Sequence, residues 1–78
     1  MSQASAIRAK SQFHVLYKLV KAENGKLVVD RWRDYYGTPR TYMLACEEAS
    51  KLEGEKGDRY VFMVRHAKVW KEMQNDKR

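Results

Sequence analysis

The sequence contains few of the residues that form disulfides, bind metals or cross membranes. Among its 78 residues, one is cysteine, two are histidine and one is proline. A single cysteine, Cys46, cannot form an internal disulfide, and no His or Cys spacing matches a metal site. No apolar run is longer than Tyr60 to Val64, which is far too short to span a bilayer. We therefore expect no metal, no cofactor and no membrane partner.

Groups suited to catalysis are equally sparse. His14 and His66 stand apart, and neither lies at a motif spacing from Cys46 that would pair a base with a nucleophile. There is no phosphate-binding glycine loop and no Ser-His-Asp order. A chain of this length also has little volume for an enclosed pocket. The sequence predicts a protein that is not an enzyme and has no small-molecule substrate.

The two ends of the sequence differ from its middle. Residues 1–11 lack an apolar stretch of signal-peptide length, which favours a cytoplasmic protein. They are mostly small and polar and include two cations, so they predict a flexible basic arm. Residues 74–78 predict a flexible tail. Residues 12–73 are expected to form a single α+β domain.

Charge is abundant and is unevenly distributed along the chain. The formal net charge is +6. Residues 1–46 have a net charge of +5, residues 47–58 of −3 and residues 59–78 of +4. This asymmetry favours an anionic partner, because the summed field of the cations attracts it at long range. The alternative is that the charges only keep the protein soluble.

Two segments rich in β-branched and aromatic residues predict a β-hairpin. They cover residues 13–22 and 26–36, and the pair Asn24-Gly25 lies between them. This dipeptide is typical of a two-residue type I′ turn, in which both residues have positive φ. That turn would set Tyr17 opposite Trp32, because the loop length fixes the pairing of the strands.

A helix and a third strand follow the hairpin. Thr38 and Pro39 suit the N-cap and the first helical position, and Gly54 suits the end, so the helix is predicted over 39–53. Its apolar stripe consists of Tyr42, Ala45, Cys46, Ala49 and Leu52. Residues 59–69 predict a strand with Tyr60, Phe62 and Val64 on one face. Residues 65–73 could instead leave the sheet as a short helix ending at Met73, and the pattern leaves both options open.

The predicted fold is α+β with the element order β-β-α-β. The first strand is apolar on both faces, with Leu16 and Val20 on one and Val15 and Leu19 on the other, which is typical of a central strand. We therefore expect a three-stranded, mainly antiparallel sheet in the order 2-1-3, with the helix packed on one face.

The expected register divides the hairpin into a covered and an open face. The residues expected under the helix are Phe13, Val15, Tyr17, Leu19, Val28, Trp32 and Tyr36. On the open face Lys18 would lie opposite Arg31, a like-charge pair that an anionic ligand would relieve. The alternative is that these long side chains splay into water. The expected partner-binding residues, with two cations added from the third strand, are Lys18, Arg31, Arg33, Tyr35, His14, Arg65 and Lys68.

Two kinds of partner fit such a face. Tyr35 and Trp70 would add aromatic surface, and cations mixed with rings suit nucleic acid, where they hold phosphates and stack on bases. The same mixture suits an acidic protein surface. Known nucleic-acid-binding motifs are missing from the sequence. A monomer or a weak homodimer is expected.

The predicted order of elements, from Phe13 to Val69, resembles that of small phage-encoded inhibitors of bacterial RNA polymerase. The resemblance lies in size and element order and includes no shared motif, so it is an analogy of fold. It implies a regulatory protein that inhibits a bacterial host protein or complex. We therefore expect a non-enzymatic binding protein that docks its basic, aromatic face on an acidic macromolecular surface, with direct DNA or RNA binding as the alternative.

Overall fold

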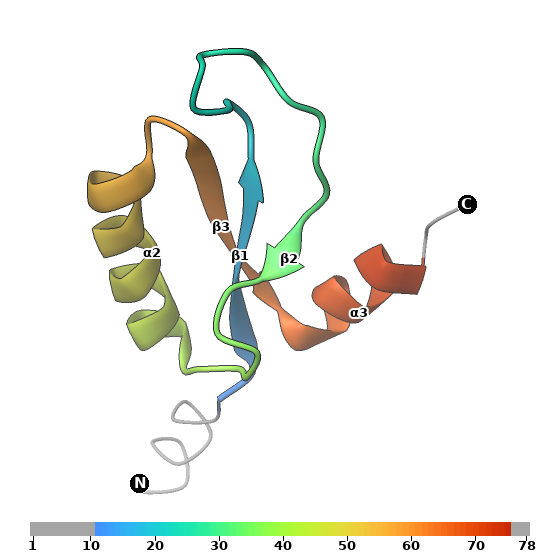
Figure 1. Cartoon of the computed structure of the whole chain (residues 1–78). Coiled ribbons are helices and arrows are strands. Elements are labelled where there is room, and N and C mark those ends of the chain that lie inside the picture. The colour runs from blue at the N-terminus through green and yellow to red at the C-terminus, as the bar shows by residue number, and fades with distance from the viewer. Residues whose placement is uncertain (1–10, 76–78) are drawn as a thin grey trace, which may run out of the picture.

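The structure, a computed structural model of the chain, describes residues 11–75. A β-sheet lies between two helices (Figure 1). The elements in chain order are β1 (Phe13–Leu19), β2 (Arg33–Asp34), α2 (Tyr42–Lys56), β3 (Tyr60–His66) and α3 (Ala67–Asn75). Residues 1–10 and 76–78, which include most of the predicted arm and tail, lie outside the described residues. Gln74 and Asn75, expected in the tail, are the last residues of α3.

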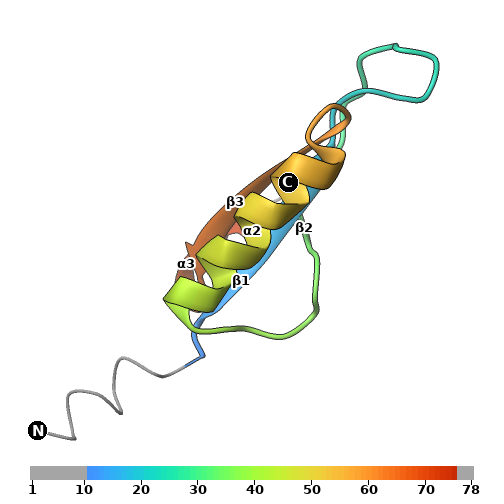
Figure 2. The same ribbon diagram turned by 90° about the vertical axis from the view of Figure 1, so that its left-hand side faces the viewer.

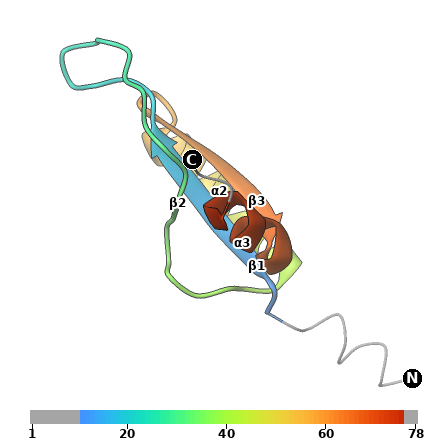
Figure 3. The ribbon, with the colours of Figure 1, turned by 90° about the vertical axis from the view of Figure 1, so that its right-hand side faces the viewer.

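The sheet confirms the predicted α+β fold and strand order. Its three strands lie in the order β2-β1-β3, and β1 is antiparallel to both neighbours. Val15 and Leu16, adjacent on the central strand β1, point to opposite faces and are 1% and 0% exposed. Both faces of the sheet are covered at this point, by α2 on one side (Figure 2) and by α3 on the other (Figure 3).

The hairpin turn differs from the predicted type I′ turn. The Gly25 N–H donates to the carbonyl of Ala22 at 3.0 Å, and the Ala22 N–H donates to the carbonyl of Lys26 at 2.8 Å. Only the glycine of the turn has positive φ, at 86°, whereas type I′ needs positive φ at Asn24 as well. The loop therefore has three residues, Glu23 to Gly25, and the predicted two-residue turn is wrong.

This longer loop is followed by a different register. Tyr17 lies opposite Arg33 rather than Trp32. A shift of one residue turns every side chain of a strand to the other face of the sheet. Trp32 is therefore not beneath α2, whereas Tyr35 is, which reverses the facing expected for these two residues. The expected covered face holds for Tyr36 and for Phe13, Val15 and Tyr17 of β1.

Between the turn and β2 the second strand is not continuous. Residues 28–32 are not in a strand. The Leu19 N–H donates at 3.0 Å to the Asp30 carboxylate, which takes the place of a backbone carbonyl in the ladder. The expected like-charge pair of Lys18 and Arg31 is also absent, because Arg31 is outside the strand and Tyr17 is already opposite Arg33.

Helix α2 begins and ends three residues later than the sequence predicts. Arg40 still forms a β-bridge with Phe13, with N–H···O distances of 2.7 and 2.9 Å, so the chain is extended where the helix was expected. Thr41 is the N-cap, and its Oγ1 accepts from the Leu44 N–H at 3.3 Å. At the other end Gly57, rather than Gly54, caps the helix, and a Cβ there would collide with the Glu53 carbonyl.

The core lies between α2 and the sheet. Its buried residues are Val15, Ala45 and Leu52. Packed around them are partly buried side chains, most of them aromatic, namely Phe13, Tyr35, Tyr36, Ala49, Phe62 and Val64. Ala45, Ala49 and Leu52 of the predicted stripe therefore face the core. Cys46 is half-buried and is not part of the core cluster, and Tyr42 is 58% exposed, with its ring centre 5.0 Å from that of Phe13 in an edge-on contact.

The third strand ends at His66, where the chain turns directly into α3. This is the second of the two options left open by the sequence, with a helix that extends to Asn75 rather than to Met73. The half-buried residues of α3, Ala67, Trp70 and Met73, are spaced three apart and lie on one side of the helix. In the part of the chain that is described, no helix has the length and apolar character needed to cross a membrane.

Candidate interaction groove

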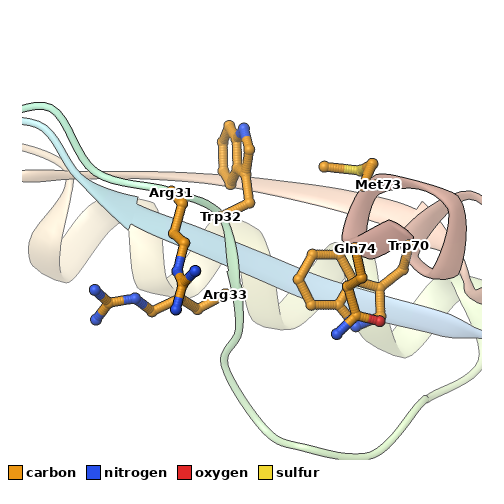
Figure 4. Close-up of a pocket in the computed structure, with 6 residues that line it drawn as sticks. All are labelled: Arg31, Trp32, Arg33, Trp70, Met73 and Gln74. Carbon is orange, nitrogen blue, oxygen red and sulfur yellow. The ribbon is translucent and has the colours of Figure 1, made fainter. Parts of the chain in front are cut away.

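A groove of about 480 Å³ lies on the face of the sheet opposite α2. One wall is the segment leading into β2 and the other is α3 (Figure 4). Its lining residues, which we name the tryptophan groove, are Arg31, Trp32, Arg33, Trp70, Met73 and Gln74. Met73 extends from α3 toward the side of the groove that holds Trp32 (Figure 4). The groove therefore joins aromatic and basic side chains from segments far apart in the sequence.

The two arginines of the groove differ in their pairing. The Arg33 guanidinium donates to the Asp30 carboxylate at 2.9 Å. Arg31 is exposed and forms no ion pair within residues 11–75. Arg31 thus offers a charge that no described carboxylate neutralises, which makes it the stronger candidate for contact with an anionic ligand.

Asp30 holds this wall in place. Hydrogen bonds from the Leu19 N–H and then from the Arg31 N–H lower the pKa of its carboxyl, and the positive charge of Arg33 adds to the effect. The carboxylate is therefore ionised at neutral pH. One side chain both completes the β1 ladder and positions the backbone next to Trp32.

Lys18 adds a third cation beside the groove. Its Nζ lies 4.9 Å from the centre of the Trp32 ring, within the range of a cation–π interaction. Lys18 comes from the central strand, so the ring rests against the rigid part of the sheet. Lys18 therefore contacts Trp32 at the groove that Arg31 and Arg33 also line, and Trp32 is not beneath α2.

Two of the expected contact residues are not available on the open face. His14 is buried, and its Nδ1 lies 2.8 Å from Oδ2 of Asp34. Tyr35 lies on the α2 face, where its ring contacts Tyr17 at 5.3 Å and Tyr36 at 4.8 Å, edge-on in both cases. The placement of Tyr35 on the open face is wrong, because the register shift reverses the facing of this strand.

The other two expected residues are exposed but outside the groove. Arg65 projects from β3 and donates to the carbonyl of Val64 at 2.8 Å. Lys68 lies in the first turn of α3. Both add positive charge to the surface around the groove without lining it.

Sequence reasoning missed most of the α3 wall. Trp70 was expected near the cations and does line the groove, whereas Met73 and Gln74 were not expected there. The signal was the spacing of Trp70 and Met73 by three residues, which is helical, among the polar residues of 67–75. The residues that remained ambiguous between strand and helix therefore form one side of the site.

Chemical groups for metal binding are not clustered in the structure. Across the described positions 11–75, no group of three or more His, Cys, Asp or Glu residues is placed to hold an ion. The groove itself contains no carboxylate among its lining residues. Its chemistry is that of contact: indole rings, a thioether, an amide and guanidinium groups.

Comparisons with known proteins add no relative to this description. No protein-family model matches the chain, and neither the curated proteins nor the solved structures contain a significant match. The functional conclusion therefore depends on the geometry of the tryptophan groove.

Proposed function

We propose that this protein is a non-enzymatic binding module that docks the tryptophan groove, and the cations around it, on an acidic surface of a partner protein. The observation that carries the proposal is the position of Arg31, exposed and without an ion-pair partner among residues 11–75, in a groove that two indole rings also line. Trp and Arg dominate the energetic centres of protein interfaces, because they combine large contact area with directed hydrogen bonds.

The surroundings of the groove favour a protein partner. On the segment that leads to Arg31, Leu27 is 84% exposed and Val29 is fully exposed. Aliphatic side chains gain free energy by burial against another apolar surface and gain little against a phosphate backbone. An acidic protein surface with apolar pockets would contact both the cations and these side chains.

An inhibitory role for the module is suggested by analogy of fold. The order β-β-α-β resembles that of small phage-encoded inhibitors of bacterial RNA polymerase, and α3 is an addition to that order which supplies one wall of the groove. An inhibitor needs only to occupy a surface of its target, which agrees with an open groove built for contact.

Nucleic acid is the second candidate, supported by Trp32 and Trp70. Both rings are half-buried and line an open groove, and indole rings beside cations can stack on the bases of a single strand. Such binding depends steeply on salt, because each neutralised phosphate releases counterions. Tryptophan fluorescence during titration with a single-stranded oligonucleotide, at low and at physiological salt, separates the two candidates. Binding with a steep log–log salt slope would favour the second candidate over the first.

Capture of partners from a bacterial lysate tests the groove. The tagged protein is compared with Arg31→Glu and with Lys51→Glu, a matched charge reversal on the exposed part of α2. We expect Arg31→Glu to lose the nuclease-resistant partners that both the wild type and Lys51→Glu retain. Circular dichroism establishes that both variants are folded. Equal recovery by all three proteins would reject the groove as the contact surface.

A further inference from the structure

The outer edge of β3 is a second surface with unused bonding capacity. In its ladder with β1, hydrogen bonds join Val20 to Arg59 at 2.8 Å and Ala67 to Gln12 at 2.7 Å. Antiparallel pairs alternate between bonded and non-bonded, so the odd-numbered residues of β3 direct their backbone groups toward β1. The even-numbered residues Tyr60, Phe62 and Val64 direct theirs outward.

Nothing in the described part of the chain pairs with this edge. Figures 2 and 3 both show β3 as the border of the sheet, with α2 and α3 on the faces rather than beyond the strand. The one contact is the Arg65 guanidinium, which donates to the outward carbonyl of Val64 at 2.8 Å. Arg65 is exposed, so it can leave this carbonyl without opening the core.

The composition of β3 is unusual for an open edge. From Val61 to Val64 it consists of four consecutive apolar residues, all only half-buried, whereas Val15 and Leu16 of the central strand are buried. Natural edges are protected by proline, by bulges or by charges. The opposite edge follows this rule, because β2 is two residues long and carries Arg33. In β3 only Arg65 provides such protection.

We propose that β3 pairs antiparallel with β3 of a second copy of this chain, about a two-fold axis at Met63, to join two sheets into one. In this register Phe62 lies opposite Val64 of the second copy, and Arg65 lies opposite Val61. Pairing about Phe62 would instead set Arg65 opposite Arg59, and like charges directly opposite are destabilising. The strand is thus complementary to itself, as a closed two-fold interface requires.

The two Met63 side chains meet at the axis as a directly opposed, non-hydrogen-bonded pair, the closest kind in an antiparallel sheet. Met63→Lys and Met63→Glu each place two like charges there, and we expect each to weaken self-association roughly tenfold or more. An equimolar mixture of the two variants places opposite charges at the axis. We expect the mixture to form heterodimers about as tightly as the wild type dimerises.

Sedimentation velocity over a concentration series measures these effects. Val29→Lys is the matched control, since it adds the same charge at a fully exposed apolar residue far from β3, and it should dimerise like the wild type. Arg65→Ala frees the Val64 carbonyl and should strengthen the dimer. A wild type that stays monomeric at every concentration overturns the proposal. So does a mixture of Met63→Lys and Met63→Glu that remains monomeric while the wild type dimerises.

Discussion

The two faces of the sheet differ in the contacts that their arginines make within the fold. On the α2 face the Tyr36 hydroxyl donates to the Glu48 carboxylate, and the Arg40 guanidinium lies 3.9 Å from the centre of the Tyr36 ring. On the α3 face Arg31 remains open to solvent beside Trp32. Arg40 thus packs against a ring within the fold on the first face, whereas Arg31 forms no ion pair with a described residue on the second. Under the proposed function, folding and binding would depend on separate sides of one sheet.

The distribution of charge sharpens this contrast. Residues 47–58, which have a net charge of −3, form most of α2 and the turn after it. The cations Arg31, Arg65 and Lys68 project from the opposite face or from the edge beside it. The proposed anionic partner would be repelled by the side that holds the core and attracted by the side that holds the groove, and this would orient the encounter before contact.

The largest expected effect is on the stability of the α2 face. Leu52 is buried against Val15 and Ala45, so Leu52→Ala should lower the free energy of unfolding by about 3 kcal/mol through lost burial and a residual cavity. Urea denaturation measures the loss. Leu44→Ala on the exposed part of the same helix is the control, with an expected loss of under about 1 kcal/mol. Comparable losses in the two variants would mean that α2 does not carry the core.

The matching change on the other face should act on binding. Trp70→Ala removes an indole wall of the groove, and truncation of such an anchor costs about 2 kcal/mol of binding free energy, roughly 30-fold in affinity. Titration calorimetry with the captured partner measures it. Val69→Ala, the exposed neighbour, should bind like the wild type. If Trp70→Ala binds the partner as tightly as the wild type, α3 does not contribute to the binding surface.

The contrast between the faces also explains which features could be predicted from sequence. The period-two pattern of β1 identified Phe13, Val15 and Tyr17 as the covered side, because a central strand must bury both faces and its aromatic side needs the larger partner. The strand order followed from the same residues. The helix stripe with Ala45 and Leu52 was equally readable, since its small residues let α2 lie close to the sheet.

The register of β2 could not be read in the same way. Asn24-Gly25 fits a two-residue turn and also a three-residue loop closed by Gly25, and these differ by one residue of pairing. The choice depends on contacts outside the turn, chiefly the Asp30 carboxylate bonded to Leu19 across the ladder. The loop pairs Lys21 with Leu27, and the irregular segment 28–32 then sets Tyr17 opposite Arg33. In this register Tyr35 packs against the core and Trp32 lines the groove.

A smaller effect on stability is expected from loss of the hydrogen bond between Tyr36 and Glu48 on the α2 face. Burial and then the hydrogen bond to Glu48 raise the pKa of Tyr36 to about 12. A pKa raised by folding means that the contribution is complete below the ordinary value of 10.0 and is lost as the pH rises toward 12. Tyr36→Phe should cost about 1 kcal/mol at neutral pH and flatten the alkaline decline in stability. Tyr60→Phe, which removes a hydroxyl with no hydrogen bond to a described residue, should leave that decline unchanged; a decline that persists in Tyr36→Phe would contradict the assignment.

The smallest effect concerns Asp30, which links the groove to the sheet. Its carboxyl pKa is lowered from 3.8 mainly by the Leu19 N–H, so its stabilisation is present above that value and is lost as the pH falls through the folded pKa. Asp30→Asn keeps an oxygen that can accept from Leu19 but removes the negative charge beside Arg33. The unfolding temperature of the variant should be lower than that of the wild type at neutral pH, and this difference should disappear well below pH 3.8.

Because Arg33 loses its partner, the variant should also bind the proposed acidic partner slightly more tightly. If the difference in unfolding temperature persists in acid, the side-chain amide of the Asp30→Asn variant does not replace the carboxylate as acceptor for the Leu19 N–H. The position of the groove wall would then depend on the geometry of this hydrogen bond rather than on the charge of Asp30.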